Sequence, residues 1–106
     1  MKYKRKKTGE LELFLELWDE RPHVCQVSGD YLPEFSVGCM AHCLTKGAYG
    51  SMRLNKKNII FMRYDLHHMY DHQTDKAKKD PRFKWVFELA EELRSESNSN
   101  KGYNVF

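Results

Sequence analysis

Histidine is concentrated in one segment of this chain. Four of its five histidines lie between positions 42 and 72: His42 alone in an apolar run, and His67, His68 and His72 clustered together. Histidine titrates near neutral pH, and it is also the commonest protein ligand of metals. The segment therefore contains residue types that suit metal-assisted hydrolysis, provided that the fold brings them together.

Two pairs of potential metal ligands lie on the helix expected near position 70. His67 and Asp71 are four residues apart, and so are His68 and His72. Side chains with this spacing share one helix face, so either pair can chelate one divalent ion. The two pairs point in directions about 100° apart, and the spacing alone leaves both open.

His42 and Asn58 add what a hydrolytic site needs besides a metal. A neutral histidine on a facing strand can take a proton from water, while a metal stabilises charge on a phosphate and on its leaving oxygen. An asparagine both donates and accepts, so Asn58 can hold the far nitrogen of the histidine or fix the loop. Together these residue types suit hydrolysis of a phosphodiester.

The order and spacing of these residues resemble the HNH endonuclease motif. The segment AHCLTKGAYGSMRLNKKNIIFM resembles the family pattern AHxLxKGxYxxxRLxxxNIxxL, and LHHMYDH resembles the helix that follows it. The stretch 25–29 is similar to a CxxCG-like lead-in found in many members, with Ser28 in place of the second cysteine. The resemblance covers roughly residues 12–75 and is greatest to small phage-type HNH proteins.

The resemblance implies a ββα-metal (His-Me finger) core and metal-dependent cleavage of DNA. It implies that His42 is the general base and that Asn58 orients this histidine and constrains the loop. It also implies that His67 and Asp71 bind a divalent ion such as Mg²⁺, Mn²⁺, Zn²⁺ or Ni²⁺. His68 is then a second ligand or a phosphate contact, although a register shifted by one residue would recruit His68 and His72 instead.

One position departs from the family pattern. Many members have aspartate or histidine directly before the general base, as a further metal ligand, whereas this chain has Ala41. The alternative to a nuclease is therefore a catalytically weak HNH-like module that binds nucleic acid. A domain that uses a metal only for its structure is a third possibility, and chelation should unfold such a domain.

The elements expected around these residues form an α+β fold. Apolar residues at helical spacing, from Leu11 to Trp18, predict a first helix with one buried face, and Asp80-Pro81 is a typical helix start. Two short antiparallel strands and a helix are then flanked by an N-terminal and a C-terminal helix. The expected ranges are helix 10–20, strands 24–27, 36–44 and 59–62, helix 66–73 with Asp65 as its N-cap, and a last helix from 80.

The charge distribution predicts contacts with DNA. The chain has 106 residues, enough for one domain spanning 1–106, and a formal net charge of +3. A basic arm covers residues 1–8, and we expect this arm and the tail at 95–106 to be mobile. Arg53, Lys56 and Lys57 lie inside the motif, where they either contact DNA phosphates or form ion pairs within the fold.

The three cysteines and the hydropathy predict a cytoplasmic protein. Cys25, Cys39 and Cys43 are an odd number, which favours reduced thiols, and three thiolates cannot complete a four-cysteine zinc site. We expect Cys39 and Cys43 to be small buried side chains. With neither a secretory signal nor an apolar run of membrane-spanning length in this sequence, we expect no membrane partner.

Overall fold

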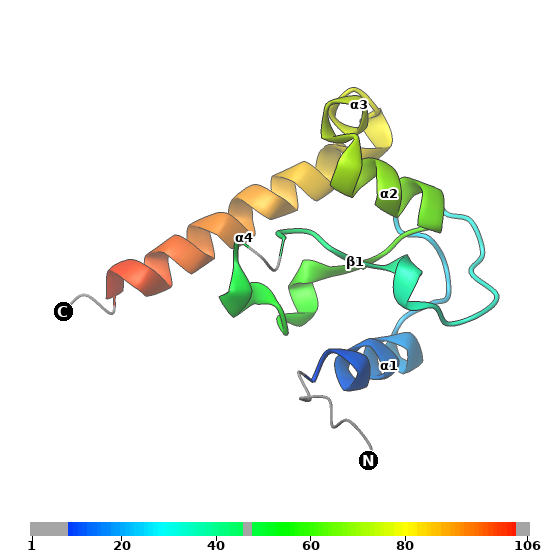
Figure 1. The fold of residues 1–106 in the computed structure, drawn as a ribbon, viewed down its shortest axis with the longest axis horizontal. Helices are drawn as coiled ribbons and strands as arrows, with labels where there is room; N and C mark the ends of the chain where they lie inside the picture. The colour runs from blue at the N-terminus through cyan, green and yellow to red at the C-terminus, as the bar shows by residue number, and fades with distance from the viewer. Residues whose placement is uncertain (1–8, 46–47, 104–106) are drawn as a thin grey trace, which may run out of the picture.

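The protein is an α+β fold in which a small antiparallel sheet lies among helices (Figure 1). The computed structural model describes residues 9–45 and 48–103, with side chains up to position 97. Four α-helices and two strands occur in these ranges: α1 (Glu10–Glu20), β1 (Met40–His42), β2 (Ile59–Phe61), α2 (Tyr64–His72), α3 (Thr74–Lys78) and α4 (Lys84–Tyr103). The coarse fold class agrees with the sequence prediction.

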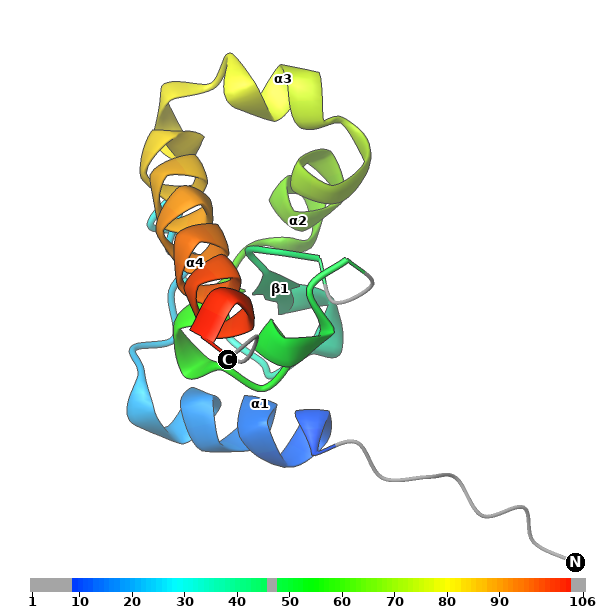
Figure 2. The same cartoon turned by 90° about the vertical axis from the view of Figure 1, so that its left-hand side faces the viewer.

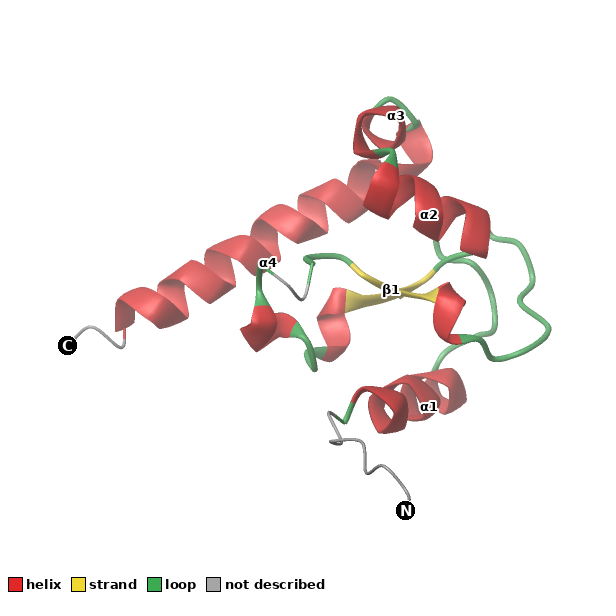
Figure 3. Ribbon diagram, viewed as in Figure 1, coloured by secondary structure: helices red, strands yellow, loops and turns green. Residues whose placement is uncertain are grey.

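The two strands pair antiparallel, and this pairing places His42 opposite Ile59 (Figure 3). All three residues of β2 are buried. β1 is shorter than the expected strand 36–44, because the Ser36 side chain accepts a hydrogen bond from the Gly38 backbone and starts a 3₁₀ turn at Val37–Cys39. This hydrogen bond to the Ser36 hydroxyl favours a turn and outweighs the β-propensity of the stretch.

α1 covers one side of the sheet with the predicted apolar face. Leu13, Phe14 and Leu17 are buried, and the helix has the predicted bounds. Arg21, directly after the helix, donates to the backbone oxygens of Lys56 (2.8 Å) and Ile59 (2.6 Å). These hydrogen bonds join the end of α1 to the segment that leads into β2.

The remaining helices follow β2 without a long loop. α3 continues from the end of α2, and the chain then turns into α4, which runs back past the sheet (Figure 2). Asp80 caps the 3₁₀ turn Pro81–Phe83 at this corner by accepting from Arg82 N, as the Asp-Pro signal predicts. α4 extends to Tyr103 and so includes much of the polar stretch expected to be a mobile tail, whereas residues 1–8 and 104–106 lie outside the described residues.

Two further expectations differ from the structure. Segment 24–27 is not a strand and makes only an isolated bridge between Val24 and Tyr31. α2 begins one residue before Asp65, which lies in its first turn rather than at the N-cap. Within the described ranges, no helix is both long and apolar enough to cross a membrane.

Candidate functional site

His42 lies at the end of β1 and is half-buried. Its Nε2 atom is 3.1 Å from the backbone oxygen of Arg53. A carbonyl oxygen only accepts, so Nε2 carries the proton, and in the neutral ring the lone pair is on Nδ1. Phe14 from α1 approaches the ring edge-on, with the ring centroids 6.0 Å apart. The backbone and an aromatic side chain therefore fix the orientation of the imidazole.

Asn58 is fully buried directly before β2, and its amide joins two loops. Its Oδ1 accepts from Leu44 N (2.7 Å), and its Nδ2 donates to the backbone oxygens of Leu44 and Met52 (both 3.1 Å). Met52 directly precedes Arg53, whose carbonyl accepts from His42. Asn58 thus holds the loop that supplies this carbonyl, consistent with the loop-fixing role that the sequence leaves open.

His67 lies in α2 between two hydrogen-bond acceptors. Its Nδ1 is 2.7 Å from the Gly38 backbone oxygen, and its Nε2 is 3.0 Å from the Asp71 carboxylate. Because both partners accept, this arrangement favours a ring that donates from both nitrogens, which is the protonated imidazole. The hydrogen bond that His67 donates to the Asp71 carboxylate raises the pKa of His67 above its ordinary value, with burial acting in the opposite direction.

The surroundings of His67 fit a metal ligand. A histidine that binds a metal generally donates its other ring N–H to a carbonyl or carboxylate, and Gly38 provides such a carbonyl here. A divalent cation in place of the Nε2 proton would satisfy both the ring nitrogen and Asp71. Across the described side chains, however, no group of three or more histidine, cysteine or acidic residues is placed to hold an ion. Water or phosphate oxygens would have to complete the coordination.

One open cleft brings the predicted base and the predicted ligands together. It has a volume of about 440 Å³ and lies between α1, β1 and α2. Its lining residues are Glu10, Phe14, Val37, Met40, His42, Thr45, His67, Asp71 and His72. His68 instead lines a smaller neighbouring hollow with Tyr64, and its ring lies 4.8 Å from that of His72. Of the two candidate pairs on α2, His67 and Asp71 both line the cleft, whereas His72 lines it without His68.

Glu10 is a site residue that the sequence analysis missed. It lies at the start of α1, 32 positions before His42, and it forms an ion pair with Arg53. Its carboxylate reaches the cleft because α1 packs against the segment that follows β1. No spacing rule connects residues in separate elements, so the sequence contains no local signal for it.

Ala41 is completely buried in the middle of β1, paired with Ile60. The position that carries a further ligand in many HNH proteins is thus part of the apolar core in this chain. A carboxylate at this point would need a compensating partner to offset its desolvation. Ala41 therefore offers no ligand to the cleft.

The three cations predicted to contact DNA are all in ion pairs. Arg53 pairs with Glu10, and Lys57 lies 3.7 Å from Glu96. Lys56 is 2.6 Å from Glu16 and 3.0 Å from Glu20 on α1. The sequence left ion pairs within the fold open as the alternative role of these residues, and such pairs are present.

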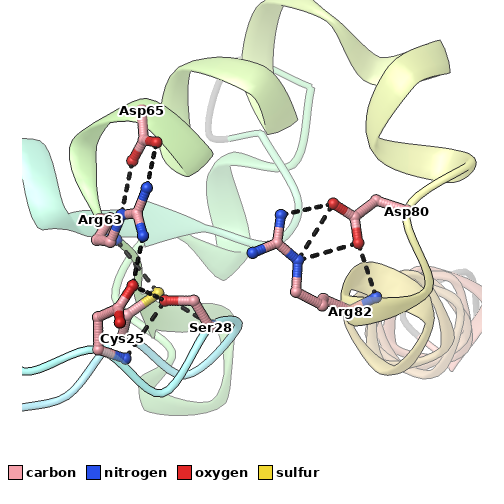
Figure 4. Close-up of polar contacts among 7 residues, drawn as sticks. Cys25, Ser28, Arg63, Asp65, Asp80 and Arg82 are labelled. Carbon is pink, nitrogen blue, oxygen red and sulfur yellow. Dashed lines mark hydrogen bonds and ion pairs between the residues drawn. The ribbon is translucent and has the colours of Figure 1, made fainter.

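The cysteine-containing loop before β1 packs onto the start of α2 (Figure 4). Cys25 Sγ accepts from the backbone N–H of Ser28 (3.3 Å) and of Arg63 (3.4 Å). Burial raises the pKa of the Cys25 thiol, but hydrogen bonds from Ser28 and Arg63 outweigh this, and the pKa lies below its ordinary value. All three cysteines are free thiols, and Cys43 is buried as predicted while Cys39 is half-buried.

Comparison of the chain with family models, with curated proteins and with solved structures finds no match. The function of the cleft is therefore argued from the sequence motif and from the geometry of His42, His67 and Asp71.

Proposed function

We propose that the protein is a metal-dependent DNA endonuclease of the HNH type that hydrolyses phosphodiester bonds in the cleft between α1, β1 and α2. The observation that carries the proposal is the placement of His67 between two acceptors, in the same cleft as His42. A carbonyl on Nδ1 and a carboxylate beside Nε2 form an arrangement that prefers a cation between the ring and Asp71.

His67 and Asp71 are the residues that would hold the ion. Imidazole suits Zn²⁺ and Ni²⁺, whereas the carboxylate suits Mg²⁺ and Mn²⁺, so a mixed pair is compatible with each of them. When bound, the ion would stabilise negative charge on the scissile phosphate and on the leaving oxygen. The ββα-metal core implied by the sequence motif has a metal-binding histidine at the start of its helix, and His67 and Asp71 lie on α2, which follows β2.

His42 is the proposed general base. Neutral His42 takes a proton from the attacking water, while its Nε2–H stays donated to the Arg53 backbone oxygen. The same carbonyl stabilises the imidazolium that forms, since it continues to accept from Nε2. Asn58 acts as a positioning residue through the loop that contains Met52 and Arg53.

A nucleic-acid-binding module without efficient catalysis is the second candidate. The complete burial of Ala41 favours it, because this position then contributes no ligand. The scarcity of protein ligands among the described residues favours it as well. Both candidates bind DNA, and they differ in whether a phosphodiester is cleaved.

Plasmid nicking in Mg²⁺, Mn²⁺, Zn²⁺ or Ni²⁺, and in EDTA, separates the two candidates. We expect nicking with at least one metal and none in EDTA. His42→Ala should lower the nicking rate about 100-fold or more, as loss of a general base does, while DNA affinity and the circular dichroism spectrum stay close to wild type. Nicking by His42→Ala at the wild-type rate would refute the assignment of the base.

A pair of aspartate variants tests the metal ligands. Asp71→Asn should abolish metal-dependent nicking, whereas Asp75→Asn should not, because Asp75 is an exposed carboxylate on α3 outside the cleft. Equal effects of the two substitutions would count against Asp71 as a ligand. DNA binding without cleavage in any of the metals would favour the binding module.

A further inference from the structure

Four lysines close together in the chain have no ion-pair partner in the described residues: Lys76, Lys78, Lys79 and Lys84. All four are exposed, and they occupy the corner between α3 and the start of α4. The other arginines and lysines whose side chains the structure describes, up to position 97, each have a hydrogen-bond or ion-pair partner within the fold. These four lysines, called the lysine corner below, are thus the cations available to an external anion.

The lysine corner is positively charged and hollowed. Segment 75–84 contains five lysines and arginines against two aspartates, and one of these aspartates, Asp80, is paired with Arg82. A cavity of about 560 Å³ opens here, with Lys78, Lys79 and Lys84 on its wall. The same wall carries Asp80, Glu88 and Glu91. Asp80 is paired with Arg82 and Glu91 with Arg94, so Glu88 is the carboxylate whose charge most directly opposes anion binding and can be used as a test.

The lysine corner follows the cleft closely in the chain. His72, on the rim of the cleft, is the last residue of α2, and α3 follows after a single residue (Figure 2). Lys76 lies four positions beyond His72, so their Cα atoms are at most about 15 Å apart. Phosphates follow one another every ~3.4 Å of helix axis along a DNA strand, so this upper limit corresponds to at most about four nucleotides.

We infer that the lysine corner binds the phosphate backbone of the DNA that enters the cleft. The inference rests on the proposed function, because the neighbouring cleft is what favours DNA over another polyanion. Lysine acts as a flexible point charge, so the contacts are independent of base sequence and weaken steeply with salt. The main contact with the DNA backbone is then at the lysine corner and not at Lys56 and Lys57. Those two lysines are paired with acidic residues of α1 and α4.

Fluorescence anisotropy of a labelled duplex, titrated with the full chain in EDTA, tests the inference without requiring cleavage. We expect the double substitution Lys78→Ala, Lys79→Ala to weaken binding about tenfold at low salt and to reduce the slope of log K against log salt by about 2. The double substitution Lys56→Ala, Lys57→Ala removes the same net charge and should change both quantities far less. Glu88→Gln should tighten binding.

The outcomes separate this inference from the proposed nuclease. Equal weakening by the two double substitutions would show that net charge alone matters and would overturn the inference. Unchanged DNA affinity of the Lys78→Ala, Lys79→Ala variant would also overturn the inference. Metal-dependent nicking by the wild-type chain would still support the proposed nuclease in that case. Binding of phosphatidylserine vesicles, instead of DNA, that depends on Lys78 and Lys79 would also overturn it. Lysine-dependent DNA binding without nicking in any metal would support the lysine corner and refute the nuclease.

Discussion

At the scale of single residues, Asn58 carries the strictest requirement. Its side chain is completely buried, and its two N–H groups satisfy the backbone oxygens of Leu44 and Met52. Asn58→Asp keeps the shape but removes both donors and turns an oxygen toward two carbonyls. Because each unsatisfied buried group costs about 1–3 kcal/mol, we expect the free energy of unfolding to fall by about 3 kcal/mol or more, measured by urea denaturation.

Asn55 provides the matched control for this substitution. Its Oδ1 accepts from Lys57 N at the start of a 3₁₀ turn, a position in which aspartate caps equally well. Asn55→Asp should therefore change stability by less than about 0.5 kcal/mol. Similar losses of unfolding free energy in Asn58→Asp and Asn55→Asp would show that the hydrogen bonds of Asn58 to the loop do not account for its contribution to stability.

At the scale of elements, Arg63 connects the cysteine-containing loop to the start of α2. It donates to Asp65 and to Asp30, and these hydrogen bonds hold the pKa of both carboxyls below their ordinary values. A depressed pKa in the folded state stabilises the fold above the ordinary pKa, and this stabilisation is lost as the pH falls through the folded value. Arg63→Gln should therefore raise both pKa values, as read from carboxyl ¹³C shifts. Its melting temperature should lie below wild type near pH 6, by a margin that shrinks under about pH 4.

Arg82 offers a comparison at the next corner of the chain. It pairs with Asp80 and lowers the pKa of that carboxyl mainly through its side-chain hydrogen bond. Arg82→Gln should raise the pKa of Asp80 and leave that of Asp65 in place. If Arg63→Gln leaves the pKa values of Asp30 and Asp65 unchanged, a group other than Arg63 keeps these carboxyls ionised.

The elements that the sequence predicts well are those whose signals are local. α1 follows from its apolar periodicity, and the corner at Asp80-Pro81 follows from cap chemistry, so both agree with the structure. The predicted strand 36–44 is too long, since the hydroxyl of Ser36 favours a turn that β-propensity alone does not reveal. The spacing of His67 and Asp71 identifies a pair that the structure also brings together.

The ion-pair partners of the charged residues could not be predicted from the sequence. Lys56 pairs with residues 36 and 40 positions away in α1, and Arg53 pairs with Glu10. Such pairs depend on how α1 packs against the loop, which is a property of the tertiary fold. For the same reason, closeness to the motif in the sequence indicates cations that are paired in the fold and gives no sign of Lys76 and Lys78 on α3, which have no ion-pair partner among the described residues.

At the scale of the whole molecule, the core is an apolar cluster that does not include the candidate metal ligands. Apolar side chains from both strands and from the helices form one buried cluster, which includes Leu17, Phe61, Leu66 and Phe83. Burial of such side chains contributes roughly 1.5–3 kcal/mol each. His67 and Asp71 lie outside this cluster, at the cleft surface. We therefore expect a metal to bind a folded chain rather than to create the fold.

Thermal denaturation with and without metal tests this expectation. EDTA should leave the melting temperature of the purified chain unchanged, because no part of the core depends on an ion. A metal present at ten times its dissociation constant should add about 1.4 kcal/mol, which for a chain of this size raises the melting temperature by roughly 5 °C. Asp71→Asn should remove this rise and Asp75→Asn should retain it. A large fall in melting temperature with EDTA would instead identify a structural metal domain, since a chelator unfolds a chain whose folding energy comes from its metal.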